Sequence, residues 1–168
     1  MQSRKIYYVP PAFVEAVGWA TIGWAQLETA IDILLAIGAE AGEGGERRTS
    51  ARGPLSLKID ALKRMSVKDG LTRDWQNDLI QLATAALRFD EDLHNAVQGT
   101  LYGRGIDSAS LEMRRLYEKT QAAPIMSRMT LGSVNELTEE LAAQTRKAIS
   151  MAIAMGEKSG LLDVGWCA

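Results

Sequence analysis

Cysteine and histidine are nearly missing from this chain. Its 168 residues contain one cysteine, Cys167, and one histidine, His94. An internal disulfide is therefore excluded, and neither a zinc site built from histidine and cysteine nor a Cys–His nucleophilic pair is expected. The scarcity of cysteine also favours a reducing compartment. The sequence predicts no metal ion and no cofactor.

An excess of charge of one sign and long apolar runs are missing too. The 19 basic and 21 acidic residues give a net charge of -2, which argues against a protein that coats nucleic acid but allows local basic patches. Tyrosines, prolines and a glutamate interrupt the N-terminal stretch where a secretory signal needs an apolar run. The nearest candidate for a membrane span, Ile31–Ile37, is short and carries Asp32. We therefore expect a cytoplasmic protein without membrane contact.

The motifs of common nucleotide and hydrolase sites are absent as well. The sequence has no GxxxxGK[ST] phosphate loop, no GxSxG nucleophile elbow and no dinucleotide fingerprint. Residues 39–53 are rich in glycine, but no predicted strand precedes them and they hold no large apolar side chain. This segment is expected to be a flexible loop.

A first long helix is expected after an extended leader of residues 1–11, because the prolines that end the leader suit a first helical turn. Its apolar residues recur at alternating steps of four and three positions from Phe13 to Leu34, which predicts one apolar face. Gly38 is expected to end the helix. Small residues seven positions apart permit close approach of a partner helix, from this chain or from a second copy: Ala16, Gly23 and Ala30.

A second long helix shows the same spacing from Trp75 to Ala96, and Gly99 is its expected end. A second apolar stripe lies roughly 100–140° round this helix from the first. It consists of Ile80, Ala83 and Leu87. A helix with two apolar stripes is expected to pack against neighbours on two sides.

Two further helices are predicted. A short one spans Pro54–Met65, with apolar residues on one side. The last opens with the S-x-x-E spacing of a capping box, Ser133 to Glu136, in which each side chain satisfies an unpaired backbone N–H. Its apolar face runs to about Glu157.

The expected fold is therefore all-α. We predict one domain over residues 1–168, an up-down helical bundle of three long helices and one short helix, with a tail at 158–168. Between residues 100 and 131 either a small β-hairpin before the last helix or irregular structure with a helical turn fits the pattern.

Polar residues interrupt the apolar pattern at the end of the second long helix. His94 and Gln98 continue its second stripe where apolar residues are expected, so they mark either satisfied structural contacts or a site. Arg88 points about 120° away from His94, on the side that carries Asn95. Arg88 and His94 cannot easily meet within one helix, but they can converge across two copies of it.

Three segments carry a resemblance to a known family. Trp24-Ala-Gln-Leu-Glu28 has the W-x-x-L-E form of a first-helix segment, and Ser56–Leu62 has the form of a short second helix. Leu93–Tyr102 is similar to a segment often written RNxxxHGxW at the end of a third helix. With these short motifs the chain resembles HEPN-domain proteins, helical bundles that commonly dimerise. Many of them are metal-independent ribonucleases of toxin–antitoxin, phage-defence and RNA-processing systems.

The catalytic motif of that family, R-x4–6-H, fits this chain in two alignments. In the first, Arg88 and His94 supply the pair. In the second, which keeps Gly99 in place, the arginine of the family falls at Leu93 and its histidine at Gln98, so the pair is lost. The resemblance implies the fold in both cases and the nuclease only in the first.

In the first alignment the resemblance implies cleavage of RNA by its own 2′-hydroxyl. His94 would act as general acid or base, and Arg88 would hold the scissile phosphate, with two such sets in one cleft of a dimer. The candidate catalytic residues are Arg88, His94, Asn95 and Gln98. Candidate RNA-binding residues are Arg47, Arg48, Arg52, Lys58, Lys63 and Arg64, with a second group at Arg104, Arg114, Arg115 and Lys119.

A second class of function needs neither Arg88 nor His94. Arg88 then pairs with Glu91 or Asp92 on a solvated face, and His94 is a hydrogen-bonded structural residue. In this alternative the chain is a non-catalytic helical module that binds a protein partner through the seam of one long helix. A homodimer is expected, and the nuclease hypothesis adds RNA and a protein antitoxin as partners.

Overall fold

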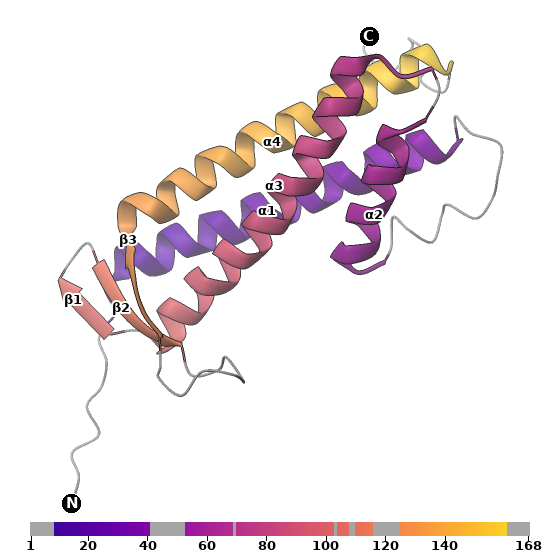
Figure 1. Ribbon diagram of the computed structural model, residues 1–168. Helices are drawn as coiled ribbons and strands as arrows, with labels where there is room; N and C mark the ends of the chain where they lie inside the picture. Colours follow the sequence, from indigo (N-terminus) through magenta and orange to yellow (C-terminus); the bar gives the residue numbers. More distant parts are fainter. Residues whose placement is uncertain are drawn as a thin grey trace, which may run out of the picture.

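The computed structural model describes residues 9–40, 53–68, 70–102, 104–107, 110–115 and 125–160. Four helices account for most of them: α1 (Pro11–Glu40), α2 (Leu55–Ser66), α3 (Arg73–Tyr102) and α4 (Leu131–Lys158). Three short strands lie between α3 and α4: β1 (Arg104–Asp107), β2 (Ser110–Arg115) and β3 (Ile125–Thr130). The chain is mainly helical, as predicted (Figure 1). Most of the predicted leader, loop and tail lies outside the described residues.

The long helices pack along one another. α1 and α4 lie side by side and run in the same direction, and α3 runs in the opposite direction (Figure 1). A Cβ built on Gly23 of α1 would lie 3.4 Å from the Leu141 Cβ of α4. The helix that approaches the small residues of α1 is therefore α4 of the same chain. α2 packs on α3 and on the C-terminal half of α1.

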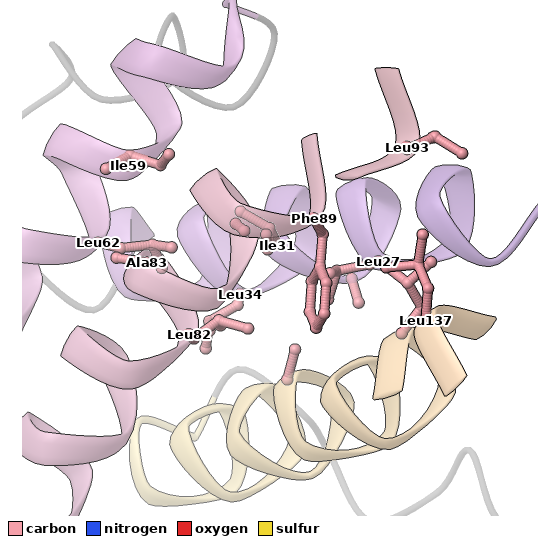
Figure 2. Packing of buried hydrophobic residues seen from close by; sticks show 14 of the residues in the cluster. Leu27, Ile31, Leu34, Ile59, Leu62, Leu82, Ala83, Phe89, Leu93 and Leu137 are labelled. Carbon is pink, nitrogen blue, oxygen red and sulfur yellow. The ribbon is translucent and has the colours of Figure 1, made fainter. Parts of the chain in front are cut away.

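The predicted seams of α1 and α3 form the core. Every apolar residue of both seams is buried except the tryptophans Trp24 and Trp75, which are partly exposed. Figure 2 shows side chains of α1, α3 and α4 in one cluster, among them Leu27, Phe89 and Leu137. Burial of each such side chain contributes about 1.5–3 kcal/mol, so this cluster fixes how the three helices sit.

α3 packs against α1 and α4 and also against α2, so it has neighbours on more than one side, as expected. Its second stripe is covered only in part, because Ala83 is buried whereas Ile80 and Leu87 are 46% and 49% exposed. The predicted end of the helix is wrong. The helix continues through Gly99 to Tyr102. A glycine inside a helix costs about 1 kcal/mol relative to alanine, which packing at either end can offset.

α4 begins earlier than predicted, and its capping box uses different residues. The Ser133 N–H donates to Thr130 Oγ1 at 3.1 Å, and the Thr130 N–H donates to Ser133 Oγ at 3.3 Å. Thr130 is therefore the N-cap, and the hydroxyl of Ser133 takes the role that the sequence assigned to Glu136.

The three strands form one antiparallel sheet in the order β1-β2-β3. β2 and β3 pair without a break from Ser110↔Thr130 to Arg115↔Ile125, whereas the β1–β2 register shifts between Gly105 and Asp107. β3 runs directly into α4, so the sheet connects the C-terminal end of α3 to the N-terminal end of α4 (Figure 1).

α1 is longer and more apolar than the short segment Ile31–Ile37, the nearest candidate for a membrane span in the sequence. Its 28 residues Pro11–Gly38 include a window of mean hydropathy 1.3, enough by length and composition to cross a membrane. The expectation that no stretch reaches that length is therefore wrong. The same helix supplies fully buried residues to the core, such as Phe13, Leu27 and Leu34. A core helix meets the same two criteria, so they do not by themselves place α1 in a membrane.

Candidate functional site

Arg88, the first candidate catalytic residue, is held by carboxylates. Its guanidinium pairs with Glu140 of α4, and its Nε lies 3.9 Å from Asp92 one turn along α3. It also lies 4.8 Å from the centroid of the Phe89 ring. The predicted pairing of Arg88 with Asp92 is confirmed. Arg88 therefore links α3 to α4 through an ion pair.

The surroundings of Arg88 are acidic. Burial raises the pKa of the Asp92 carboxyl, Arg88 lowers it, and Glu91 and Glu140 raise it further, with a net result above the ordinary value. Burial is the largest of these effects, and the carboxylates of Asp92 and Glu140 both lie at the one guanidinium of Arg88. An incoming phosphate would have to compete with these carboxylates for Arg88.

His94 lies further along α3 and is exposed. α3 is continuous through both positions, so the six-residue separation places His94 about 120° round the helix from Arg88. Arg88 turns toward α4, and the structure does not bring the two side chains together on one face. Asn95 is half-buried, and the side chain of Gln98 lies outside the described residues.

Lys58 is not a surface residue, contrary to its predicted role in binding RNA. It is 6% exposed, and its Nζ lies 2.7 Å from Asp32 Oδ1 and 3.5 Å from Glu28 Oε1 of α1. Two carboxylates therefore surround its charge, and the long apolar stem of the side chain is buried between α1 and α2. Lys58 joins two helices.

The other basic candidates divide into two groups. Lys63 and Arg64 are exposed on α2, where RNA could reach them. The remaining positions lie outside the described residues or have side chains that do: Arg47, Arg48, Arg52, Arg104, Arg114, Arg115 and Lys119.

The most unusual surface is on α1, on the side opposite the core. We call it the outer face of α1. From position 16 to position 38 every exposed residue of this helix is uncharged. These residues are Gly18, Trp19, Thr21, Ile22, Ala25, Gln26, Thr29, Ile33 and Ala36. The two acids in that range, Glu28 and Asp32, lie on the flank of α2 with Lys58.

Large apolar side chains on the outer face are open to solvent. Trp19 is 58% exposed, Ile22 49% and Ile33 48%. Even the hydroxyl of Thr29 is bonded to the helix, since its Oγ1 donates to the Ala25 carbonyl at 2.8 Å. The amide of Gln26 is therefore the main polar side-chain group that the outer face offers to water.

α4 extends this surface. Ile149 and Ile153 are 42% and 47% exposed. Because α1 and α4 run parallel with Gly23 opposite Leu141, the two isoleucines lie within about one turn of the level of Ile33. Lys147 of α4 pairs with Asp78 of α3. Ile149 comes two positions later, which is a rotation of about 200° round the helix, so it turns away from α3.

The outer face was not predicted, although its pattern is present in the sequence. The prediction for this helix rested on the apolar seam that builds the core and on the small residues beside it. The outer face has its own helical spacing, with Gly18, Ile22, Ala25, Thr29 and Ala36 separated by steps of four and three positions, the step from Thr29 to Ala36 covering one full heptad. Which of the two stripes on α1 is covered depends on tertiary packing.

A cavity of about 300 Å³ lies where the ends of the helices meet. Two lysines beside it are held by backbone groups, since Lys158 Nζ donates to the Gly70 carbonyl at 2.9 Å and Lys68 Nζ to the Gly38 carbonyl at 3.1 Å. Lys158 also lies 5.7 Å from the Trp75 ring centroid. These contacts tie the helix ends together. Within the described ranges no three histidine, cysteine or acidic side chains gather as metal ligands would.

Comparison of the chain with protein-family models, with curated proteins and with solved structures finds no match. The residues themselves therefore carry the functional inference.

Proposed function

We propose that this protein is a non-catalytic helical module that binds a protein partner through the outer face of α1. The observation that supports the proposal is a solvent-exposed helix face with Trp19, Ile22 and Ile33 and without a charged group from position 16 to position 38. Contiguous exposed apolar surface is characteristic of interaction sites, because leaving it in water costs free energy and favours association.

The charges of the molecule favour a protein partner over nucleic acid at this face. α1 contains no lysine or arginine, and RNA binding depends on cations that neutralise phosphates. Lys58, the basic residue nearest to α1 among the described ion pairs, is enclosed by Glu28 and Asp32. An apolar surface of another protein matches the outer face, whereas a phosphate backbone does not.

Photo-cross-linking in cells tests this function. A benzoylphenylalanine placed at Ile33 should form covalent adducts with protein, and the same group at Leu57 of α2 should not. The two positions are matched, since Ile33 is 48% and Leu57 47% exposed, and they differ in their surroundings. If Ile33 yields no protein adduct, or no more than Leu57, the proposal is wrong.

A HEPN-like, metal-independent endoribonuclease or a degenerate relative of one, acting in stress or phage defence in the cytoplasm, is the second candidate. Its support is the exposure of His94 and the order of α1, α3 and α4, which alternate in direction as in an up-down bundle. In this candidate the partners are RNA, a second copy and a protein antitoxin. The ion pairs of Arg88 with Glu140 and Asp92 weigh against it, because a phosphate would have to displace them.

Purified protein incubated with several single-stranded RNAs without added metal decides this candidate. A nuclease should cleave them, and His94→Ala should abolish cleavage while thermal stability stays unchanged, since His94 is exposed. Asn95→Ala serves as a companion variant on another side of α3. Equal inertness of wild type and His94→Ala would remove the nuclease and leave the binding module.

A further inference from the structure

The outer face of α1 has a pattern that is nearly the same in both directions along the helix. Along its centre the residues are small, large, small, small, large, small: Gly18, Ile22, Ala25, Thr29, Ile33 and Ala36. Reversed about the level of position 27, position 18 falls on position 36 and position 25 on position 29. Ile22 falls within one residue of Ile33, about 1.5 Å along the axis. A surface with this property places like residues opposite one another when it faces a reversed copy of itself.

We propose that the partner of this face is a second copy of the same chain, bound with the two α1 helices antiparallel about a two-fold axis near the level of Leu27. This inference rests on the proposed function and names its partner. Two-fold interfaces use the same patch on both subunits, so the patch must match its own reverse. In this arrangement Gly18 of each copy faces Ala36 of the other, and the isoleucines lie opposite one another.

The open space above Gly18 fits this arrangement. A Cβ built on Gly18 meets no atom within 4 Å, so packing within one chain does not require a glycine there. Between two helices, small residues let the backbones approach to the shorter interaxial distances. The large contacts come from Ile22 of each copy against Ile33 of the other.

The exposed apolar area extends beyond α1. The outer face runs from position 18 to position 36, so it is about 27 Å long and about 10 Å wide. That strip alone is smaller than the roughly 800 Å² that each partner contributes to a standard interface. Ile149 and Ile153 of α4, beside Ile33, and Trp19 on the flank widen it toward that value.

The charges favour a second copy over a lipid surface. Helices that lie on membranes carry lysine and arginine beside their apolar face to meet anionic headgroups. α1 has none, and the exposed charge nearest the outer face on α1 is Glu15. Between positions 18 and 36 the two faces meet without desolvating an ion. The acids Glu15 and Glu40 lie at the level of each other at the two ends of the contact, beyond these positions.

Light scattering coupled to size exclusion tests the interface. Wild-type protein should have twice the mass of one chain, and Ile22→Glu should weaken self-association by more than about tenfold, because a carboxylate would be buried without a partner. Leu57→Glu is the matched control, since Leu57 on α2 is exposed to the same degree. Circular dichroism establishes that both variants fold. A monomeric wild type, or an Ile22→Glu variant as dimeric as Leu57→Glu, would overturn the proposal. Sedimentation of such a monomer with vesicles of anionic lipid would indicate a lipid surface as the partner instead.

Disulfide trapping tests the direction of the helices. In a Cys167→Ser background, Ala25→Cys and Thr29→Cys proteins are mixed and oxidised, with a tag on one of them. Antiparallel pairing predicts the mixed disulfide as the main product. A predominance of Ala25→Cys homodimer would indicate parallel helices and contradict the two-fold arrangement.

The two proposals fail in different ways. If the cross-linker at Ile33 captures other proteins while the wild type is a monomer, the binding module stands and self-association falls. If it captures nothing, both fall.

Discussion

α1 and α3 are the two longest helices, with 30 residues each, and they differ on the side that faces away from the core. Inward, both present an apolar seam at the same four-and-three spacing. Outward, the middle of α3 carries Arg88 and three consecutive acids at positions 90–92, and Arg88 forms an ion pair with α4. The outer face of α1 carries no charge between positions 16 and 38.

The inward sides of the two helices build the core of the chain, whereas their outward sides are available for interactions with other molecules. A seam of buried apolar residues is enough to place a helix in the core, and both helices have one. Water accepts the charged residues on the outward side of α3 at little cost. The exposed Ile80 and Leu87 of α3 lie among polar and charged residues, such as Thr84 and Arg88, so they form no uncharged face. The apolar outward side of α1 is costly in water, which is the physical reason to assign the interaction to α1.

Removing one large side chain from the inward seam of α1 or from that of α3 should lower the free energy of unfolding by a similar amount. Phe13 on α1 and Phe89 on α3 are 0% and 1% exposed. Phe13→Ala and Phe89→Ala should each lower the free energy of unfolding by about 3–5 kcal/mol, through lost burial and the cavity left behind. Urea denaturation, carried out in the Ile22→Glu background so that association does not contribute, measures both. A loss below about 1 kcal/mol in either variant would mean that the two seams do not share one core.

These seams were also the most predictable part of the molecule. Heptad spacing identified the inward residues from Phe13 to Leu34 and from Trp75 to Ala96, because burial of an apolar face dominates the energy of a long helix. Element ends were less predictable. Gly99 lies inside α3, and Thr130 caps α4, because tertiary contacts override differences of about 1 kcal/mol in local preference.

The candidate site was predicted less well, for a reason that Lys58 and Ile80 illustrate. Sequence alone gives the direction of a side chain on its own helix and does not tell which neighbour covers it. Lys58 was expected on the surface and is buried against Asp32, whereas Ile80 was expected inside and is exposed. Only the placement of α2 between α1 and the flank of α3 decides both.

The ion pairs of Lys58 with Glu28 and Asp32, on the side of α1 that faces α2, should stabilise the fold. Lys58→Met keeps the apolar stem and removes the cation between Glu28 and Asp32. We expect a loss of about 1–3 kcal/mol, less than for a fully buried pair, because the two carboxylate side chains are each 36% exposed. Lys63→Met, at an exposed position on the same helix, should change stability by no more than about 0.5 kcal/mol. Thermal unfolding of the two variants side by side gives the difference, and equal effects would show that Lys58 has no structural role.

The outward charges of α3 should matter least, and their effect should depend on pH. Burial, with Glu91 and Glu140 beside it, raises the pKa of the Asp92 carboxyl against the opposing effect of Arg88. Because the folded state holds the proton more tightly than the unfolded state, ionised Asp92 costs stability at neutral pH, and this cost disappears as the pH falls through the raised pKa. Asp92→Asn should therefore stabilise the protein at pH 7 by less than about 1 kcal/mol, since the site is largely solvated, and the gain should vanish toward about pH 4. Arg88→Gln removes the group that lowers this pKa, so the pKa of Asp92 should rise further in that variant. Ionised Asp92 should then cost more stability at pH 7, and this cost should begin to decrease at a higher pH than in the wild type. Chemical denaturation across this range measures each effect, and an Asp92→Asn variant that is less stable than the wild type at pH 7 would mean that its pairing with Arg88 outweighs the acidic surroundings.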